Sequence, residues 1–164
     1  MSFLNKLFGV GNKETSNDGI TDDGITELMR LAYVGNGDSL VGYLLAPGAN
    51  HNVNAKDKNG RTALMAAAGR GNGYFAKNLI SLGKNVDVNA KDKNGWTALM
   101  MAAVKGNVDC VKNLIAAGAE VNAKNKDGCT ALMMAAAPHV KKNYLGEDEV
   151  HDVAAILRAA GARE

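Results

Sequence analysis

The chain has 164 residues, 46% of them apolar, and a formal net charge of +2. This length and composition suit one domain with a hydrophobic core and exclude a wholly disordered chain. No stretch approaches the roughly 18 consecutive apolar residues of a membrane-spanning helix, and the start, MSFLNKLFG, lacks the features of a secretory signal. Two cysteines without CxxC spacing are too few for a disulfide framework and fit a reducing compartment. We therefore expect a cytoplasmic protein.

Charge is unevenly distributed along the chain. Residues 1–53 contain three Lys or Arg against six Asp or Glu, residues 54–126 contain twelve against five, and residues 127–164 contain four against six. The centre is therefore basic and both ends are acidic. Segregated charge of this kind bears on the choice of partner rather than on the fold.

The first 22 residues differ from the rest of the chain. Four apolar side chains at i, i+4 spacing surround one lysine and predict a short amphipathic helix. Residues 9–22 come after it and are typical of a flexible linker. The helix either folds back as an N-terminal cap or frays. The alternative is an anchor to a membrane or a partner's groove, which one short helix with a single lysine would hold weakly. The residues concerned are Phe3, Leu4, Leu7, Phe8 and Lys6.

Beyond residue 22 the sequence repeats. KDKNGRTALMAAA begins at Lys56 and KDKNGWTALMMAA begins at Lys91, and a period in this range is typical of stacked repeat architectures. In each unit an Asn-Gly or Asp-Gly turn precedes a Thr that can cap a helix. The turn glycines are Gly24, Gly60, Gly95 and Gly128, and the capping threonines are Thr26, Thr62, Thr97 and Thr130.

Each unit predicts two helices. The first is short and rich in Ala, Leu and Met, so that neighbouring helices can approach it closely; its small residues include Ala66–Ala68, Ala102, Ala103 and Ala135–Ala137. The second is amphipathic, as in NVDCVKNLIAAG, which places Val108, Val111, Leu114 and Ile115 on one face and is expected to end at Gly118. Because one unit cannot bury its apolar face alone, its neighbours must cover it.

The stretch DVNAKDKNGWTALMMAAVKGNVDCVKNLIAAGAEVNAKNKDG resembles ankyrin repeats. The resemblance implies an all-α solenoid of four helix-turn-helix units with β-turn fingers, occupying residues 23–164. The expected units are about 23–54, 55–89, 90–122 and 123–162. Ala63, Ala98 and Ala131 stand where the family often has Pro, and Met65, Met100 and Met133 stand where it has His. In the family that His makes a hydrogen bond between units, so here thioether packing must substitute.

The first and last units are atypical. The first lacks the alanine-rich helix and carries Arg30 and Tyr33 at or near positions that are Ala or Val in later units. The last has ten additional residues, at about 138–149, followed by a helix with Val150, Val153, Ile156 and Leu157 on its apolar side. Terminal repeats are commonly irregular, and insertions in solenoids commonly form loops on the binding face.

No motif for catalysis, phosphate binding or dinucleotide binding is present, so we expect no enzyme, no cofactor and no metal. His51, His139 and His151 are scattered and fit surface positions. Cys110 falls on an apolar helix position and Cys129 at an exposed turn position, without an adjacent base. The acidic residues Glu147, Asp148, Glu149 and Asp152 fit a solvated helix start.

In the family, partners bind the finger tips and the exposed concave side of the first helices. Carried onto this sequence, that surface contains nine Lys or Arg, here called the basic row, and the only tryptophan, Trp96. Trp and Arg are typical of binding hot spots. The alternatives are that the lysines mainly keep the finger tips soluble and that Trp96 merely covers the neighbouring helix. The basic row is Lys56, Lys58, Arg61, Arg70, Lys91, Lys93, Lys105, Lys124 and Lys126, and Asn59, Asn94, Val104, Asp127 and Cys129 accompany it.

These residues favour a monomeric, non-enzymatic module that binds an acidic protein. The TALM motif resembles bacterial members of the family, which suggests an inhibitor, immunity or effector-docking role. Two alternatives remain. One is nucleic-acid binding through the basic row, disfavoured by the acidic ends and the scarcity of stacking aromatics. The other is a membrane-peripheral scaffold held by residues 1–8.

Overall fold

The computed structural model describes residues 26–34, 37–45, 52–83, 85–136 and 147–163. These residues form eight α-helices in four consecutive pairs. The first helices of the pairs are α2 (Glu27–Val34), α4 (Ala63–Arg70), α6 (Ala98–Lys105) and α8 (Ala131–Ala136). The second helices are α3 (Gly37–Leu45), α5 (Gly73–Leu82), α7 (Val108–Ala116) and α9 (Glu147–Ala159). The expected all-α solenoid is confirmed.

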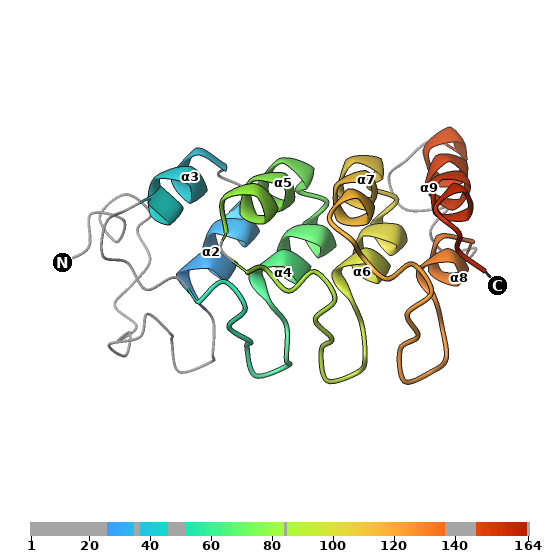
Figure 1. Ribbon diagram of the computed structural model, residues 1–164, viewed down its shortest axis with the longest axis horizontal. Helices are drawn as coiled ribbons and strands as arrows, with labels where there is room; N and C mark the ends of the chain where they lie inside the picture. Colours follow the sequence, from blue (N-terminus) through green and yellow to red (C-terminus); the bar gives the residue numbers. More distant parts are fainter. Residues whose placement is uncertain (1–25, 35–36, 46–51, 84, 137–146, 164) are drawn as a thin grey trace.

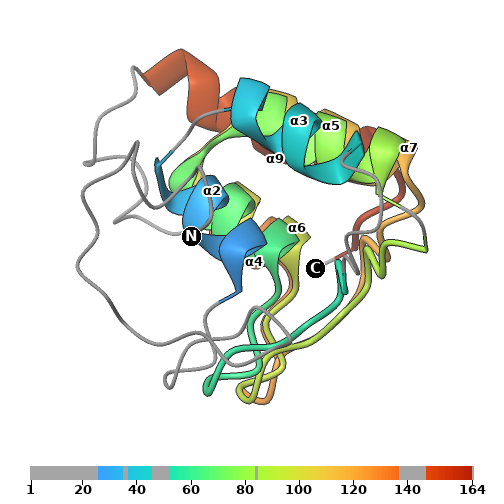
Figure 2. The same cartoon turned by 90° about the vertical axis from the view of Figure 1, so that its left-hand side faces the viewer.

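The helices lie in two layers. Figure 1 shows α3, α5, α7 and α9 side by side in one layer and α2, α4, α6 and α8 in the other. Among the described residues, long fingers project from the second layer before α4, α6 and α8, and we number them by unit as the second, third and fourth fingers. The view along the stack in Figure 2 superimposes the helices of each layer and shows the two layers apart, with the fingers below α2, α4 and α6. We call α2, α4, α6 and α8 the inner helices, and the surface that they form with the finger tips the inner face.

Threonine side chains begin the inner helices as expected. The Thr62 hydroxyl accepts a hydrogen bond from the Met65 backbone N–H at 3.3 Å, and Thr97 does the same for Met100 at 3.3 Å. Thr26 and Thr130 make the equivalent bonds, to Met29 and Met133. Each hydroxyl satisfies one backbone donor that would otherwise lack a partner at the helix start.

Alanine allows the inner helices to pack closely. α4 packs on α2 and α6, and α6 packs on α4 and α8. Ala67, Ala68, Ala102 and Ala103 are at most 1% exposed, and Met65 and Met100 are buried equally well. At the end of the stack the packing is looser than expected. Ala136 is exposed and Met133 is 39% exposed, because no further inner helix covers α8 among the described residues. Ala137 lies outside them.

The outer helices bury one face each. In α7, Cys110, Val111 and Leu114 are buried, whereas Asp109 and Lys112 are exposed. After α7, Gly118 adopts φ +88° and its N–H donates to the Ile115 carbonyl. A positive φ here costs glycine little, so Gly118 ends the helix as predicted.

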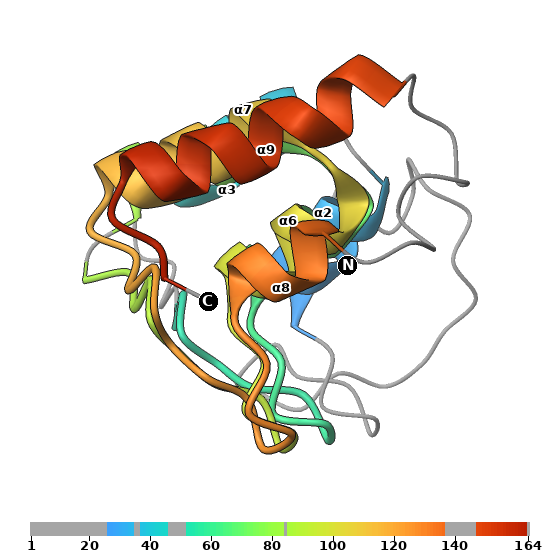
Figure 3. The same cartoon turned by 90° about the vertical axis from the view of Figure 1, so that its right-hand side faces the viewer.

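The last outer helix corrects one expectation. The additional residues were placed at 138–149, but α9 already begins at Glu147, so the final three belong to a helix. α9 has 13 residues against 9 in α7, and Figure 3 shows it extending past its neighbours. Val153 and Leu157 are fully buried, as predicted for its apolar side. Residues 137–146 and the N-terminal segment lie outside the described residues.

At the base of each described finger, one asparagine joins that finger to the following unit. Asn54 donates from Nδ2 to the Asn85 carbonyl at 2.7 Å and accepts from the Asp87 N–H at 2.8 Å. Asn89 makes the same pair with the Gly118 carbonyl and the Glu120 N–H. Asn122 makes it with Gly161 and Arg163, beyond α9. We call these pairs the asparagine clasps.

Within the described ranges, every helix is too short or too polar to cross a lipid bilayer.

Candidate partner-binding site

Each finger tip is a turn closed by one side chain. Asp92 Oδ1 accepts backbone N–H groups from Asn94 at 2.8 Å and Trp96 at 2.9 Å. Asp57 accepts two equivalent bonds in the preceding finger, and Asn125 Oδ1 accepts two in the following one. These side chains fix the tips from within. The tip surface is therefore rigid before any partner arrives.

Adjacent tips are also bonded to one another. The Lys93 N–H donates to the Asn59 carbonyl, and the Lys126 N–H donates to the Asn94 carbonyl, each at 3.0 Å. The tips approach so closely that a Cβ on Gly95 would lie 3.0 Å from the Lys126 nitrogen. The predicted site residues on neighbouring units are thus held in one continuous surface.

The lysines of the basic row divide into two groups. All nine of its cations are exposed. Lys56 Nζ donates to the Lys91 carbonyl at 3.0 Å, and Lys91 Nζ donates to the Lys124 carbonyl at 3.3 Å. These two side chains therefore help to hold the fingers in register. Lys124 occupies the same position in the fourth finger, where the described residues offer its amine no acceptor.

The two arginines are partly engaged. Arg61 Nε lies 4.0 Å from Oδ2 of Asp92, whose side chain is only 4% exposed. Arg70 lies over the ring of Tyr33, with 5.3 Å from its guanidinium carbon to the ring centroid. A cation above an aromatic ring is attracted to it. Both arginines are held against the neighbouring unit while their outer surfaces remain exposed.

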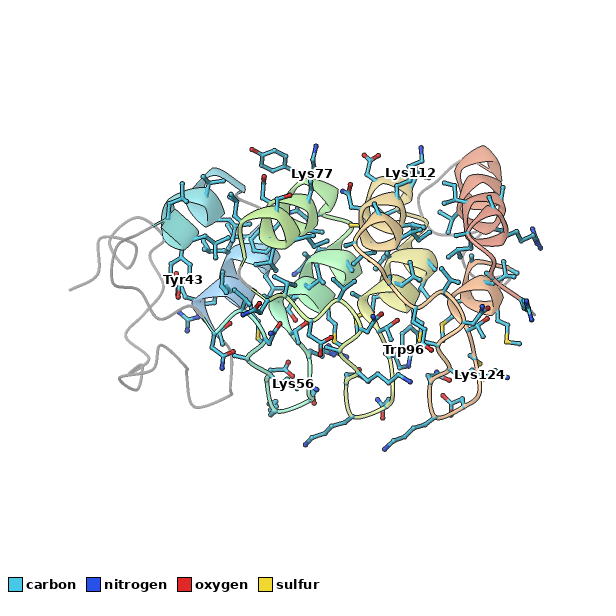
Figure 4. The ribbon with its side chains drawn as sticks, in the orientation of Figure 1. Tyr43, Lys56, Lys77, Trp96, Lys112 and Lys124 are labelled. Atoms are coloured by element: carbon cyan, nitrogen blue, oxygen red, sulfur yellow. The ribbon has the colours of Figure 1, made fainter. Side chains whose placement is uncertain are left out.

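Five cations of the basic row have no bonded partner among the described residues, and one of them is Lys124 of the fourth finger. Lys58, Lys93 and Lys126 lie on successive finger tips, and Lys105 ends α6. Lys77 and Lys112 are also exposed, but they project from α5 and α7 on the outer layer, away from the fingers (Figure 4). The inner face thus carries a positive charge that the described residues leave uncompensated.

Trp96 lies at an open pocket of about 320 Å³ on the inner face. It comes from the third finger tip, next to α6 in Figure 4, and it is partly buried against the core. Trp96 therefore packs against the core and also lines the pocket, and its contact with a partner stays a prediction. The pocket is lined by Trp96, Val104, Asn125, Asp127, Cys129, Met133 and Met134.

Sequence analysis did not identify four residues of this face. Met133 and Met134 of α8 complete the pocket, and Tyr33 and Val34 end α2 with 39% and 61% of their surface exposed. For Tyr33 and Val34, aligning the repeats would have revealed their place on this face. Counting from the capping threonine, Tyr33 and Val34 align with Gly69–Arg70 and with Val104–Lys105. The irregularity of the first unit concealed that alignment.

The described residues contain no group of three or more His, Cys, Asp or Glu that could hold a metal ion. His51 and His139 lie outside them, as do the side chains of His151 and the acidic start of α9. Cys110 is fully buried, and this burial, together with the nearby Asp109 carboxylate, raises the pKa of its thiol to about 12. Such a thiol is inert at neutral pH.

Comparison with known proteins agrees with this architecture. A family model described as ankyrin repeats (3 copies) matches residues 28–125 and, in a second overlapping match, residues 76–144. Together the matches cover well over half of the chain and include α2 to α8. No curated protein matches it. The chain belongs to the ankyrin-repeat family.

Proposed function

We propose that this protein is a non-enzymatic interaction module that binds an acidic protein partner across its inner face. Ankyrin repeats generally mediate protein–protein interaction and are typically not enzymes. The observation that carries the proposal is the set of cations without a partner among the described residues, on the same inner face as the Trp96 pocket: Lys58, Lys93, Lys105, Lys124 and Lys126. In a bacterium, such a module would serve as an inhibitor, an immunity protein or a docking site for an effector.

The physical basis is complementarity rather than strong individual bonds. One exposed ion pair contributes only about 0–1 kcal/mol, so the five lysines act mainly by steering an acidic surface toward the inner face. Affinity then depends on apolar contacts at the centre, where Trp96 and the methionines lie. The rigid finger tips reduce the entropy lost on binding.

A charge-reversal pair tests this proposal. The Lys93→Glu/Lys105→Glu variant reverses two inner-face cations, and the Lys77→Glu/Lys112→Glu variant makes the same change in net charge on the outer layer. We expect the inner-face variant to capture at least about tenfold less of the partner protein than the native chain does, because two favourable charges become repulsive. The outer-layer variant should bind as the native protein does. The measurement is quantitative mass spectrometry of nuclease-treated captures from the source cell.

Equal capture by all three proteins would exclude the inner face as the binding surface. Loss that appears only when nuclease is omitted would indicate a nucleic acid in place of a protein. Far-ultraviolet circular dichroism of each variant controls for folding, since all four lysine side chains are exposed and bond no described residue.

A further inference from the structure

We propose that the Trp96 pocket receives one tyrosine or tryptophan side chain of an acidic partner segment, with Asp127 accepting a hydrogen bond from the polar tip of that side chain. This inference rests on the proposed function and adds the chemistry of the partner's anchor residue. It follows from the size of the pocket, from the one lining side chain that can still accept a strong hydrogen bond, Asp127, and from the lysines at the pocket edge.

The pocket suits one large apolar side chain. Its volume of about 320 Å³ is at the lower end of ligand pockets, which span roughly 300–1,000 Å³. One wall is the Trp96 ring, and others are Val104 of α6 and the two methionines of α8. Aromatic rings pack well against indole and thioether groups, and the unbranched methionines can adjust to the shape of the guest.

Among the lining side chains, Asp127 is the acceptor with capacity left. Oδ1 of Asn125 already accepts the N–H groups of Asp127 and Cys129, at 3.0 and 2.9 Å, and its Nδ2 donates to Asp127 at 3.4 Å. The Asp127 carboxylate receives only that long bond among the described residues. A carboxylate can only accept hydrogen bonds. The anchor must therefore carry a donor, such as the tyrosine hydroxyl or the indole N–H.

Charge around the pocket determines the sequence near the anchor. Lys105 directly follows Val104, and Lys126 lies between Asn125 and Asp127. Both lysines are exposed and bond no acceptor among the described residues. A partner segment with Asp or Glu on either side of a neutral aromatic anchor would satisfy these lysines and Asp127 together. A basic anchor would be repelled by the lysines.

The test begins with random peptides displayed on phage and selected on the full chain at physiological salt. We expect enrichment of peptides with one Tyr or Trp between acidic residues. A Tyr-containing winner and its Phe analogue are then synthesised, and their binding is followed by the emission of Trp96. Trp96 is the only tryptophan of the chain, so with these peptides its emission reports on the pocket alone.

A double-mutant cycle isolates the hydrogen bond. We expect the change from Tyr to Phe to weaken binding to the native protein by about tenfold, since the bond has a charged acceptor. With Asp127→Ala the two peptides should bind within about twofold of each other. Glu120→Ala removes an exposed charge outside the pocket and should keep the tenfold ratio. Removing any carboxylate from the protein strengthens the binding of an acidic peptide. This gain is the same for the Tyr and Phe peptides, so it cancels in the ratio of their affinities.

Three results of the peptide experiments would overturn the inference. They are enrichment of acidic peptides without an aromatic residue, an unchanged Tyr-to-Phe ratio in Asp127→Ala, and no enrichment over a protein-free control. The first would leave the proposed function intact, because the lysines alone would then bind the partner. A shift of Trp96 emission on simple dilution of the protein would also overturn it, by showing that a second copy of the chain occupies the pocket.

Discussion

The two cysteines show how strongly the position of one residue controls its chemistry. Cys110 is 0% exposed in α7, and burial raises the pKa of its thiol to about 12. Cys129 is partly exposed on the fourth finger, where its thiol donates a weak 3.9 Å hydrogen bond to the Asp127 carbonyl and lines the Trp96 pocket. The first acts as a small apolar core residue, and the second borders the binding surface.

The buried thiol predicts a pH dependence of stability. Its pKa is raised in the folded protein from an ordinary value of 9.0 to about 12, so above pH 9 the unfolded chain loses a proton that the folded chain keeps. This contribution to stability is complete below that value and is lost as pH rises toward 12, by up to about 1.4 kcal/mol per pH unit. Urea unfolding of the native protein and Cys110→Ala should show their stability difference shrinking across this range.

Parallel stability profiles for the two proteins would contradict this prediction. Other groups that titrate in alkali, such as Tyr43, whose pKa burial also raises, affect both proteins alike and cancel in the difference. At neutral pH, the difference in unfolding free energy between the native protein and Cys110→Ala measures the cost of the cavity that removal of the sulfur leaves.

At the same scale, the structure separates lysines that sequence analysis treated together. The basic row was identified from its register, and all nine of its cations are exposed. Register alone did not distinguish Lys56 and Lys91, whose amines bind the next finger, from Lys93 and Lys126, whose amines bind no described residue. The difference depends on how far apart successive fingers lie, which a sequence period does not specify.

At the scale of the element, the fingers depend on their neighbours. Gly95 and Gly128 occupy equivalent tip positions with φ of +80° and +78°. A Cβ on Gly95 would lie 3.0 Å from the Lys126 nitrogen, whereas a Cβ on Gly128 would meet nothing within 4 Å of the atoms described. The two glycines share a backbone requirement and differ only in how closely the next finger approaches.

This pair gives a matched test of contact between fingers. Gly128→Ala should cost roughly 1–2 kcal/mol, the strain of a side chain at positive φ. Gly95→Ala should cost about 1 kcal/mol more, because the fourth finger must also move away. Urea unfolding of both variants measures the difference. Equal losses would mean that the fingers adjust without cost.

Sequence patterns predicted most elements well, because local rules decide them. Capping threonines, alanine-rich inner helices and Gly118 at the end of α7 follow from short-range geometry. The start of α9 was misplaced because its first turn lacks a repeat counterpart to align with. The Trp96 pocket could not be predicted, since it joins side chains from two fingers and two helices whose spacing is a tertiary property.

At the scale of the whole molecule, the stack makes stability depend on position. α6 packs against α4, α8 and α7, whereas α8 packs against α6 and α9 and leaves Met133 exposed. Stability in such arrays is approximately a sum over neighbouring interfaces, so units with two neighbours should open less often than terminal ones.

Hydrogen exchange at two equivalent residues would measure this gradient. Ala102 and Ala135 hold the same place in α6 and α8, and both are at most 1% exposed. We expect the Ala102 amide to exchange at least roughly tenfold more slowly, because opening α6 breaks interfaces on both sides. Identical rates would indicate that the described units unfold as one cooperative block.

The asparagine clasps finally bear on how such a chain can change length. The last unit has ten additional residues between Met133 and Gly161, yet Asn122 still reaches Gly161 and Arg163 at 3.1 and 2.8 Å. Extra chain between the paired helices therefore leaves the joint at the finger base unchanged. Each clasp also uses the same atoms, so duplication of an internal unit would reproduce a complete joint at both ends. The architecture thus permits evolution to lengthen the array by whole units and to vary the helix connections separately.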